Sequence, residues 1–139
     1  SITTPGIAKK VITVGASDDA VPIWIDGKRL QNYSGRGNPN IDLIKPEVVA
    51  PAREIISLKR MVNYKYRLLS DAYTAKSGTS MATPVVAGAL ALLLEQNPRL
   101  TPDEVKERLK SGCRDLGLPA IQQGAGIIWI PKLLNCQSI

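Results

Sequence analysis

The sequence of 139 residues contains no histidine and no phenylalanine. Histidine is the side chain that takes the proton from serine in a Ser-His-Asp arrangement, so the chain cannot build that arrangement from its own residues. Aromatic residues make up 4% of the chain, whereas hydrophobic residues make up 44%. We therefore expect a substantial core that is built from aliphatic side chains.

Long apolar runs and strong charge clusters are also missing. The longest apolar run, Val85 to Leu94, is too short to span a bilayer, and no signal peptide is present, so we expect no membrane partner. The net charge is +6, but the charges are spread along the chain, which favours a solvated surface over a nucleic-acid site. The first residue is not Met, which suggests an excised segment. Nothing in the sequence identifies the compartment.

Cysteine is limited to Cys113 and Cys136. Their spacing matches no metal-binding pattern, and we expect neither a metal nor a cofactor. The two thiols could pair in an oxidising compartment or stay separate in a reducing one. We favour free thiols, because a domain with this core should not need a covalent link.

The most distinctive stretch is Ser77 to Pro84 together with the apolar run from Val85 to Leu94. Ala and Leu are strong helix formers, and no charge appears before Glu95. A helix that is apolar around its whole circumference is typically buried on every side. This stretch therefore predicts a buried helix that is entered through small polar residues.

The start of this helix can be placed from four residues. Gly78 allows a sharp entry, and Thr79 or Ser80 is available to cap the helix. Pro84 is tolerated only near a helix start, where its missing N–H is not needed. Ser80 therefore lies at or just inside the N-terminus, where unpaired N–H groups and the positive end of the dipole meet. Such a position suits a nucleophilic hydroxyl, because the same N–H groups can hold an oxyanion.

The segment from Gly78 to Gly88 resembles the nucleophile motif of the subtilisin-like serine proteases, the subtilases. The resemblance implies that Ser80 is the acylating serine of a peptidase and that Gly78, Thr79 and Pro84 support the nucleophile turn. It extends over nearly the whole chain. Similar segments precede the motif at 8–16, 33–39 and 45–51, and one follows it at 124–128.

The resemblance also implies a fold. Residues 1–139 are identified as a single partial domain, the C-terminal portion of a three-layer α/β/α domain with a mostly parallel sheet. In subtilases the catalytic residues follow the order Asp, His, Ser, so the Asp, the His and the Asn oxyanion donor would lie upstream of this chain. We therefore expect the isolated chain to be inactive.

The expected partners follow from the same reasoning. The intact parent would act on a peptide or protein substrate, and the missing N-terminal half of the domain would cover one face of the motif helix. Without that half, exposed apolar surface should drive self-association. Thr3 lies in a loop that resembles the border of the pocket for the residue before the cleaved bond, and it is a candidate wall of that pocket. A plain turn explains Thr3 equally well.

Elsewhere the chain predicts ordinary structural elements. Asp18, Asp19 and Asp26 cluster at turns, which favours solvated loop residues over a metal or acid–base site. Asp26-Gly27 between strand-like runs predicts a type I′ hairpin. The other expected elements are strands at 11–16, 48–49 and 127–130, a helix at 102–111 with a capping box from Thr101 to Glu104, and a short helix from Pro131.

Three other functions remain open. The chain could be a pseudopeptidase or regulatory domain that keeps the fold without chemistry. The basic and aromatic residues between Lys59 and Arg67 could bind nucleic acid, although a variable surface loop is the favoured interpretation. Lys76 could serve Ser80 as a base, but nothing in the sequence predicts the desolvation that would lower its pKa.

Overall fold

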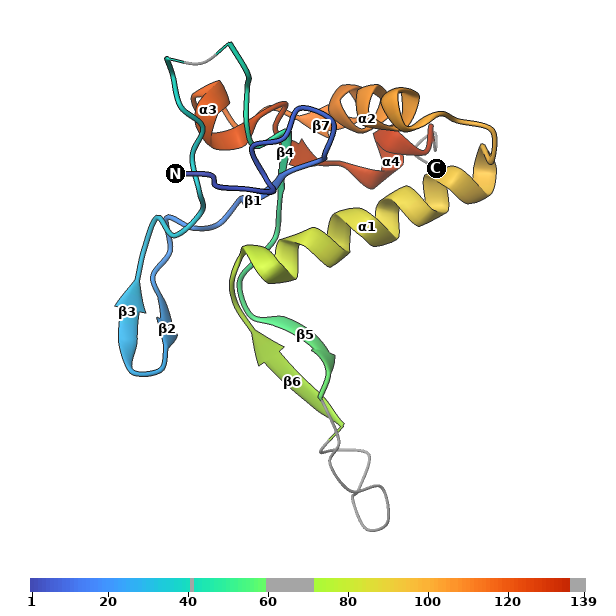
Figure 1. The fold of residues 1–139 in the computed structure, drawn as a ribbon. Helices are drawn as coiled ribbons and strands as arrows, with labels where there is room; N and C mark the ends of the chain where they lie inside the picture. The colour runs from blue at the N-terminus through green and yellow to red at the C-terminus, as the bar shows by residue number, and fades with distance from the viewer. Residues whose placement is uncertain (41, 60–71, 136–139) are drawn as a thin grey trace.

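The structure, a computed structural model, describes residues 1–40, 42–59 and 72–135 (Figure 1). Its centre is a four-stranded sheet in the order β1-β4-β8-β7. The neighbours β1–β4 and β4–β8 are parallel, and only β7–β8 is antiparallel. The predicted α/β fold with a mostly parallel sheet is therefore confirmed. The strands are β1 (Val14–Ala16), β4 (Val48–Ala50), β7 (Cys113–Arg114) and β8 (Ile127–Ile128).

Strand β4 lies between two neighbours and is buried along its whole length. Its sequence, Val-Val-Ala, is the unbroken apolar run that is typical of a parallel strand covered on both faces. It pairs in register with β1, so that Val14 lies opposite Val48. The strand expected at 11–16 is shorter in the structure and starts at Val14. Val11 is exposed and its carbonyl instead accepts hydrogen bonds from lysine side chains.

The described residues form four helices beside the sheet: α1 (Thr79–Gln96), α2 (Pro102–Ser111), α3 (Ala120–Gln123) and α4 (Ile130–Leu133). Helix α1 packs against β1 and β4, and α2 contacts both α1 and α4. One hydrophobic core joins these elements through buried residues such as Val86, Leu93, Leu109 and Leu133. The core is aliphatic, as the composition predicts, and it fixes the start of α1 beside the end of β4.

Helix α1 is covered on one side only within this chain, as expected if other chain normally covers its remaining surface. The buried residues of α1 are Ala82, Val86, Ala89 and Leu93, which lie on a single face. Leu92 and Leu94 on the remaining surface are 45% and 38% exposed. The apolar pattern of the sequence runs all round the helix, but the described residues cover only one side of it.

Two antiparallel hairpins extend from this body (Figure 1). The first joins β2 (Ile23–Ile25) to β3 (Lys28–Leu30) through Asp26 and Gly27, which both have positive φ. Positive φ at both central residues defines the predicted type I′ turn. The second joins β5 (Ile55–Leu58) to β6 (Tyr73–Lys76), and it leads directly into α1.

A buried ion cluster ties α2 to the sheet. The Glu47 side chain is 5% exposed, and its Oε1 lies 2.7 Å from Lys45 Nζ and 2.6 Å from Lys106 Nζ. Its Oε2 accepts a hydrogen bond from the Thr13 N–H at 2.7 Å. Burial alone would raise the pKa of Glu47, but the hydrogen bonds from Lys106 and Lys45 outweigh it and lower the pKa. The carboxylate is therefore charged and fully partnered.

The C-terminal part of the chain closes against β4 through two glycines. A Cβ on Gly124 would lie 2.2 Å from the backbone oxygens of Pro46 and Glu47, and one on Gly126 would lie 2.2 Å from that of Arg114. Only glycine therefore allows the backbone to approach this closely at these two positions. Cys113 is buried and has no disulfide partner among the described residues, and burial raises the pKa of its thiol to about 11. Cys136, its possible partner, lies outside the described residues.

Candidate active site at the start of helix α1

The start of α1 is set by Gly78. This residue is the N-cap, and its φ of 138° falls in the region that favours glycine. No side chain caps the helix, so the expectation that Thr79 or Ser80 would do so is wrong. Within the helix, the Thr83 hydroxyl donates a hydrogen bond to the Thr79 carbonyl at 3.1 Å.

Ser80 is the second residue of α1, as the motif predicts, and it is exposed. At this position an α-helix offers no carbonyl to the backbone N–H of Thr79 or Ser80. Pro84 lies inside the helix four residues later and has no N–H to give to the Ser80 carbonyl. The Ser80 hydroxyl therefore stands at the positive end of an 18-residue helix, beside free N–H groups.

The approach to Ser80 is held by backbone contacts to the end of β4. The Gly78 N–H donates to the Ala52 carbonyl at 2.8 Å, and the Ser77 hydroxyl accepts from the Glu54 N–H at 2.9 Å. The Asp18 carboxylate in turn accepts from the N–H groups of Ala52 and Arg53, at 3.1 and 3.0 Å. These contacts fix the turn that presents Ser80.

Asp18 thus has a positioning role that the sequence pattern did not reveal. The expectation that the three carboxylates are solvated is also wrong for Asp19, which is 3% exposed and accepts from the Ser34 N–H. Asp26 is exposed at its turn, as expected. Burial, followed by the nearby charges of Asp18 and Asp19, raises the pKa of Tyr33 to about 12. In the described part of the chain, no cluster of three or more acidic or cysteine side chains could hold a metal ion.

Two pockets flank Ser80. A cleft of about 660 Å³ lies between the β5–β6 hairpin and the first turns of α1, and Ser80 forms part of its wall. Its other lining residues include Ile56 and Leu58, which are each 73% exposed. A second pocket of about 630 Å³ lies on the side of the β2–β3 hairpin and reaches Ser77 and Met81. Ser80 is therefore accessible from open, partly apolar space.

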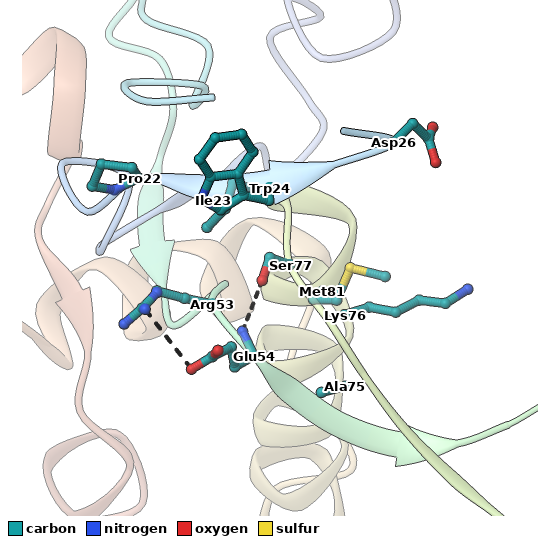
Figure 2. A pocket seen from close by; sticks show the side chains of 10 residues that line it. All are labelled: Pro22, Ile23, Trp24, Asp26, Arg53, Glu54, Ala75, Lys76, Ser77 and Met81. Atoms are coloured by element: carbon teal, nitrogen blue, oxygen red, sulfur yellow. Dashed lines mark hydrogen bonds and ion pairs between the residues drawn. The ribbon is translucent and has the colours of Figure 1, made fainter. Parts of the chain in front are cut away.

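No base is positioned for Ser80 within residues 1–40, 42–59 and 72–135, where none of the side-chain hydrogen bonds involves its hydroxyl. Lys76 lines both pockets, but Figure 2 shows its side chain extending away from Ser77 and Met81. Lys76 is also exposed, and no described hydrogen bond joins it to Ser80.

Thr3 is not brought to this site by any described pocket contact. It is exposed in the N-terminal turn, where its carbonyl accepts from the Ile7 N–H at 3.1 Å, and it lines neither pocket beside Ser80. Its role as a pocket wall stays a prediction. Most of the basic and aromatic segment between Lys59 and Arg67 lies outside the described residues. None of the described helices is long and apolar enough to cross a membrane.

Comparisons with known proteins agree on one group. A family model described as the subtilase family matches residues 1–127. The serine protease AprX of Bacillus subtilis is 46% identical over 117 residues, which cover 81% of this chain. The chain spans only 26% of the length of that relative.

Solved structures give the same fold. The protease CspB of Clostridium perfringens superposes with a TM-score of 0.70 at 28% identity, over 95% of this chain and 28% of its own. Fervidolysin of Fervidobacterium pennivorans, a keratinolytic enzyme related to subtilisin, superposes with a TM-score of 0.71 at 23% identity. That match covers 96% of this chain and 20% of fervidolysin.

Proposed function

The chain belongs to the subtilase family of serine proteases, and on this premise we propose that Ser80 is the acylating nucleophile of a peptidase. The observation that carries the proposal is the position of Ser80, exposed and second in a helix whose start no side chain caps. The Ser80 oxygen attacks the scissile carbonyl while its proton passes to a base. The backbone N–H of Ser80 donates to the oxyanion. The base then protonates the leaving amine, and water hydrolyses the acyl-enzyme.

The base, the carboxylate that orients it and the second oxyanion donor come from chain outside these 139 residues. The absence of histidine from the sequence supports this division. So does the exposed position of Lys76. The isolated chain carries the nucleophile alone and is therefore inactive in peptide cleavage.

The partner that supplies those groups is the rest of the same catalytic domain. The surface where it would pack includes Ile56 and Leu58, which line the cleft between the β5–β6 hairpin and α1 and are each 73% exposed. Leu92 and Leu94 extend this uncovered surface along α1. Large apolar surfaces of this kind are seldom left in water, so the isolated chain self-associates through them.

A fluorophosphonate probe tests this proposal, because it modifies serines that a base activates. We expect the isolated chain to stay unlabelled while circular dichroism shows it folded. A longer protein that joins this chain to an upstream Asp and His should be labelled, and Ser80→Ala should abolish that labelling. Ser111→Ala, which changes an exposed serine at the end of α2 that lines neither pocket beside Ser80, is the matched control and should leave labelling intact.

Two results would contradict the proposal in different ways. Rapid labelling of Ser80 in the isolated chain would mean that a base exists within these residues or across an oligomer. A folded longer protein that is never labelled would identify a pseudopeptidase that has kept the fold without the chemistry.

A further inference from the structure

Glu54 adopts a backbone conformation that its side chain does not explain. Its φ is 51°, in the left-handed region that is unfavourable for a residue with a Cβ. The side chain is 71% exposed, and its only ion pair in the described part of the chain is with Arg53, at 4.0 Å. An exposed pair of this kind contributes little to stability. Contacts of the backbone must therefore hold the conformation.

Backbone contacts fix the chain on both sides of Glu54. Before it, the Asp18 carboxylate accepts hydrogen bonds from the N–H groups of Ala52 and Arg53. After it, β5 begins at Ile55 and pairs with β6. A strained backbone conformation persists only where surrounding contacts over-determine it, and such residues cluster at functional sites. The strain at Glu54 therefore calls for a functional explanation.

The hydrogen bond that Glu54 makes in this conformation leads to the candidate nucleophile (Figure 2). The Glu54 N–H donates to Ser77 Oγ at 2.9 Å. The next residue, Gly78, donates its N–H to the Ala52 carbonyl at 2.8 Å. The turn before Ser80 is thus attached at two successive residues to the segment that follows β4. Positioning of this kind matters for catalysis, because a displacement of about 1 Å can slow a reaction by orders of magnitude.

From these contacts we propose that Glu54 is a positioning residue for the reaction at Ser80. Its left-handed backbone directs its N–H to Ser77 Oγ, and this hydrogen bond holds the turn that presents the nucleophile. The role belongs to the backbone of Glu54, since its carboxylate is exposed. The inference rests on the proposed function, because it concerns the same nucleophile.

The test uses the longer protein that joins this chain to an upstream Asp and His. It measures the maximal rate of fluorophosphonate labelling and the probe concentration that gives half of that rate. Ser77→Ala removes the acceptor and should lower the maximal rate about tenfold, at an unchanged half-maximal concentration. Ser77→Thr keeps a hydroxyl and should stay near the wild-type rate.

Variants of Glu54 separate its backbone from its side chain. Glu54→Val should lower the maximal rate about tenfold, because a β-branched residue strongly disfavours positive φ. Glu54→Gly should keep the rate within about twofold, because glycine adopts this conformation freely. A loss in Glu54→Gly as large as that in Glu54→Val would assign the effect to the carboxylate and overturn the inference.

Asn32→Val is the matched control for strain. Asn32 has a φ of 53°, is exposed and lines neither pocket beside Ser80. Both valine variants should lower the urea midpoint, but only Glu54→Val should slow labelling. Equal labelling rates in the two valine variants, or a wild-type rate in Ser77→Ala, would show that Glu54 has no positioning role.

Amide hydrogen exchange in the full chain tests the inference without any activity. Protection of the Gly78 N–H should fall about tenfold in Ser77→Ala and in Glu54→Val, and it should stay unchanged in Asn32→Val. Unchanged protection in Ser77→Ala would overturn the inference. A longer protein that is never labelled would instead contradict the proposed function, so the two failures are distinguishable.

Discussion

Helices α1 and α2 follow one another in the chain, but their N-termini are built in opposite ways. Helix α2 has a complete capping box, in which Thr101 accepts from the Glu104 N–H and Glu104 accepts from the Thr101 N–H. It also has Pro102 at its first position, acidic residues in its first turn and basic residues in its last. Helix α1 has no side-chain cap, no acidic residue in its first turn and no basic residue in its last.

The N-terminus of α2 is capped by side chains of the helix itself, whereas the N-terminus of α1 is left open to groups from elsewhere. In α2 the Thr101 hydroxyl already accepts from the Glu104 N–H, and Pro102 has no N–H to offer, so less of this helix start is open to a ligand oxygen. Those of α1 remain open at Ser80, where a developing negative charge can be held. Packing shows the same openness to other groups, because large apolar side chains of α1 such as Leu92 remain exposed. The uncapped start of α1 is therefore the feature on which the proposal for Ser80 depends.

The largest effect should come from breaking the attachment of α2. Glu47→Gln removes the charge between Lys45 and Lys106, and it leaves two ammonium groups in a buried site without their counter-charge. We expect a loss of about 3–5 kcal/mol in the free energy of unfolding, measured by urea denaturation. Glu107→Gln is the matched control. Its pair with Lys110 is exposed, so we expect a change below about 1 kcal/mol. Equal effects of the two variants would show that the buried cluster does not hold α2.

The second comparison lies within α1, between adjacent leucines. Leu93 is fully buried, so Leu93→Ala should cost about 2–5 kcal/mol through lost burial and the cavity left behind. Leu92→Ala should stay within about 1 kcal/mol in urea denaturation, because that side chain is 45% exposed.

In sedimentation measurements of self-association, we expect the exposed Leu92 to matter more than the buried Leu93. Leu92→Glu should reduce self-association of the chain, because it places a charge on the uncovered surface. A wild-type chain that stays monomeric at high concentration, or an association that Leu92→Glu does not change, would contradict the partner proposed for this surface.

These comparisons also show which structural features the sequence alone could predict. The capping box of α2 and the Asp-Gly hairpin are decided by neighbouring residues, so local chemistry predicted both. The apolar run of α1 predicted a helix but not which of its faces is buried. Burial depends on which other segments of the fold pack against the helix. The run itself is consistent with full burial.

The residues of the candidate site also differ in whether the sequence could predict them. The position of Ser80 follows from Gly78 and Pro84, which the sequence shows directly. The support from Asp18 could not be predicted, since its carboxylate reaches Ala52, 34 residues away, only after β1 and β4 have paired. The pocket beside the β2–β3 hairpin is similar, because no sequence pattern connects that hairpin to Met81.

A third pair of variants compares the two helix starts directly. Thr101→Ala removes the cap of α2 and should cost about 1 kcal/mol in thermal or urea denaturation. Ser80→Ala should change stability by no more than about 0.5 kcal/mol, since Ser80 is exposed and caps nothing. The same substitution should abolish probe labelling in the longer protein. A loss at Ser80 as large as that at Thr101 would mean that the Ser80 hydroxyl is structural, and it would weaken its assignment as a nucleophile.

The smallest effect should be a pH dependence confined to the attachment of α2. The pKa of Glu47 is lowered in the folded chain from its ordinary value of 4.5, although burial opposes the two lysines. A lowered folded-state pKa contributes stability that is present above pH 4.5 and is lost as the pH falls through the folded-state value. The difference in urea midpoint between the wild type and Glu47→Gln should therefore shrink below pH 4.5. The buried residues of α1 are all apolar, so the cost of Leu93→Ala should stay constant over the same range. If the Leu93→Ala cost followed pH instead, the two helices would be coupled, and the contrast drawn between them would fail.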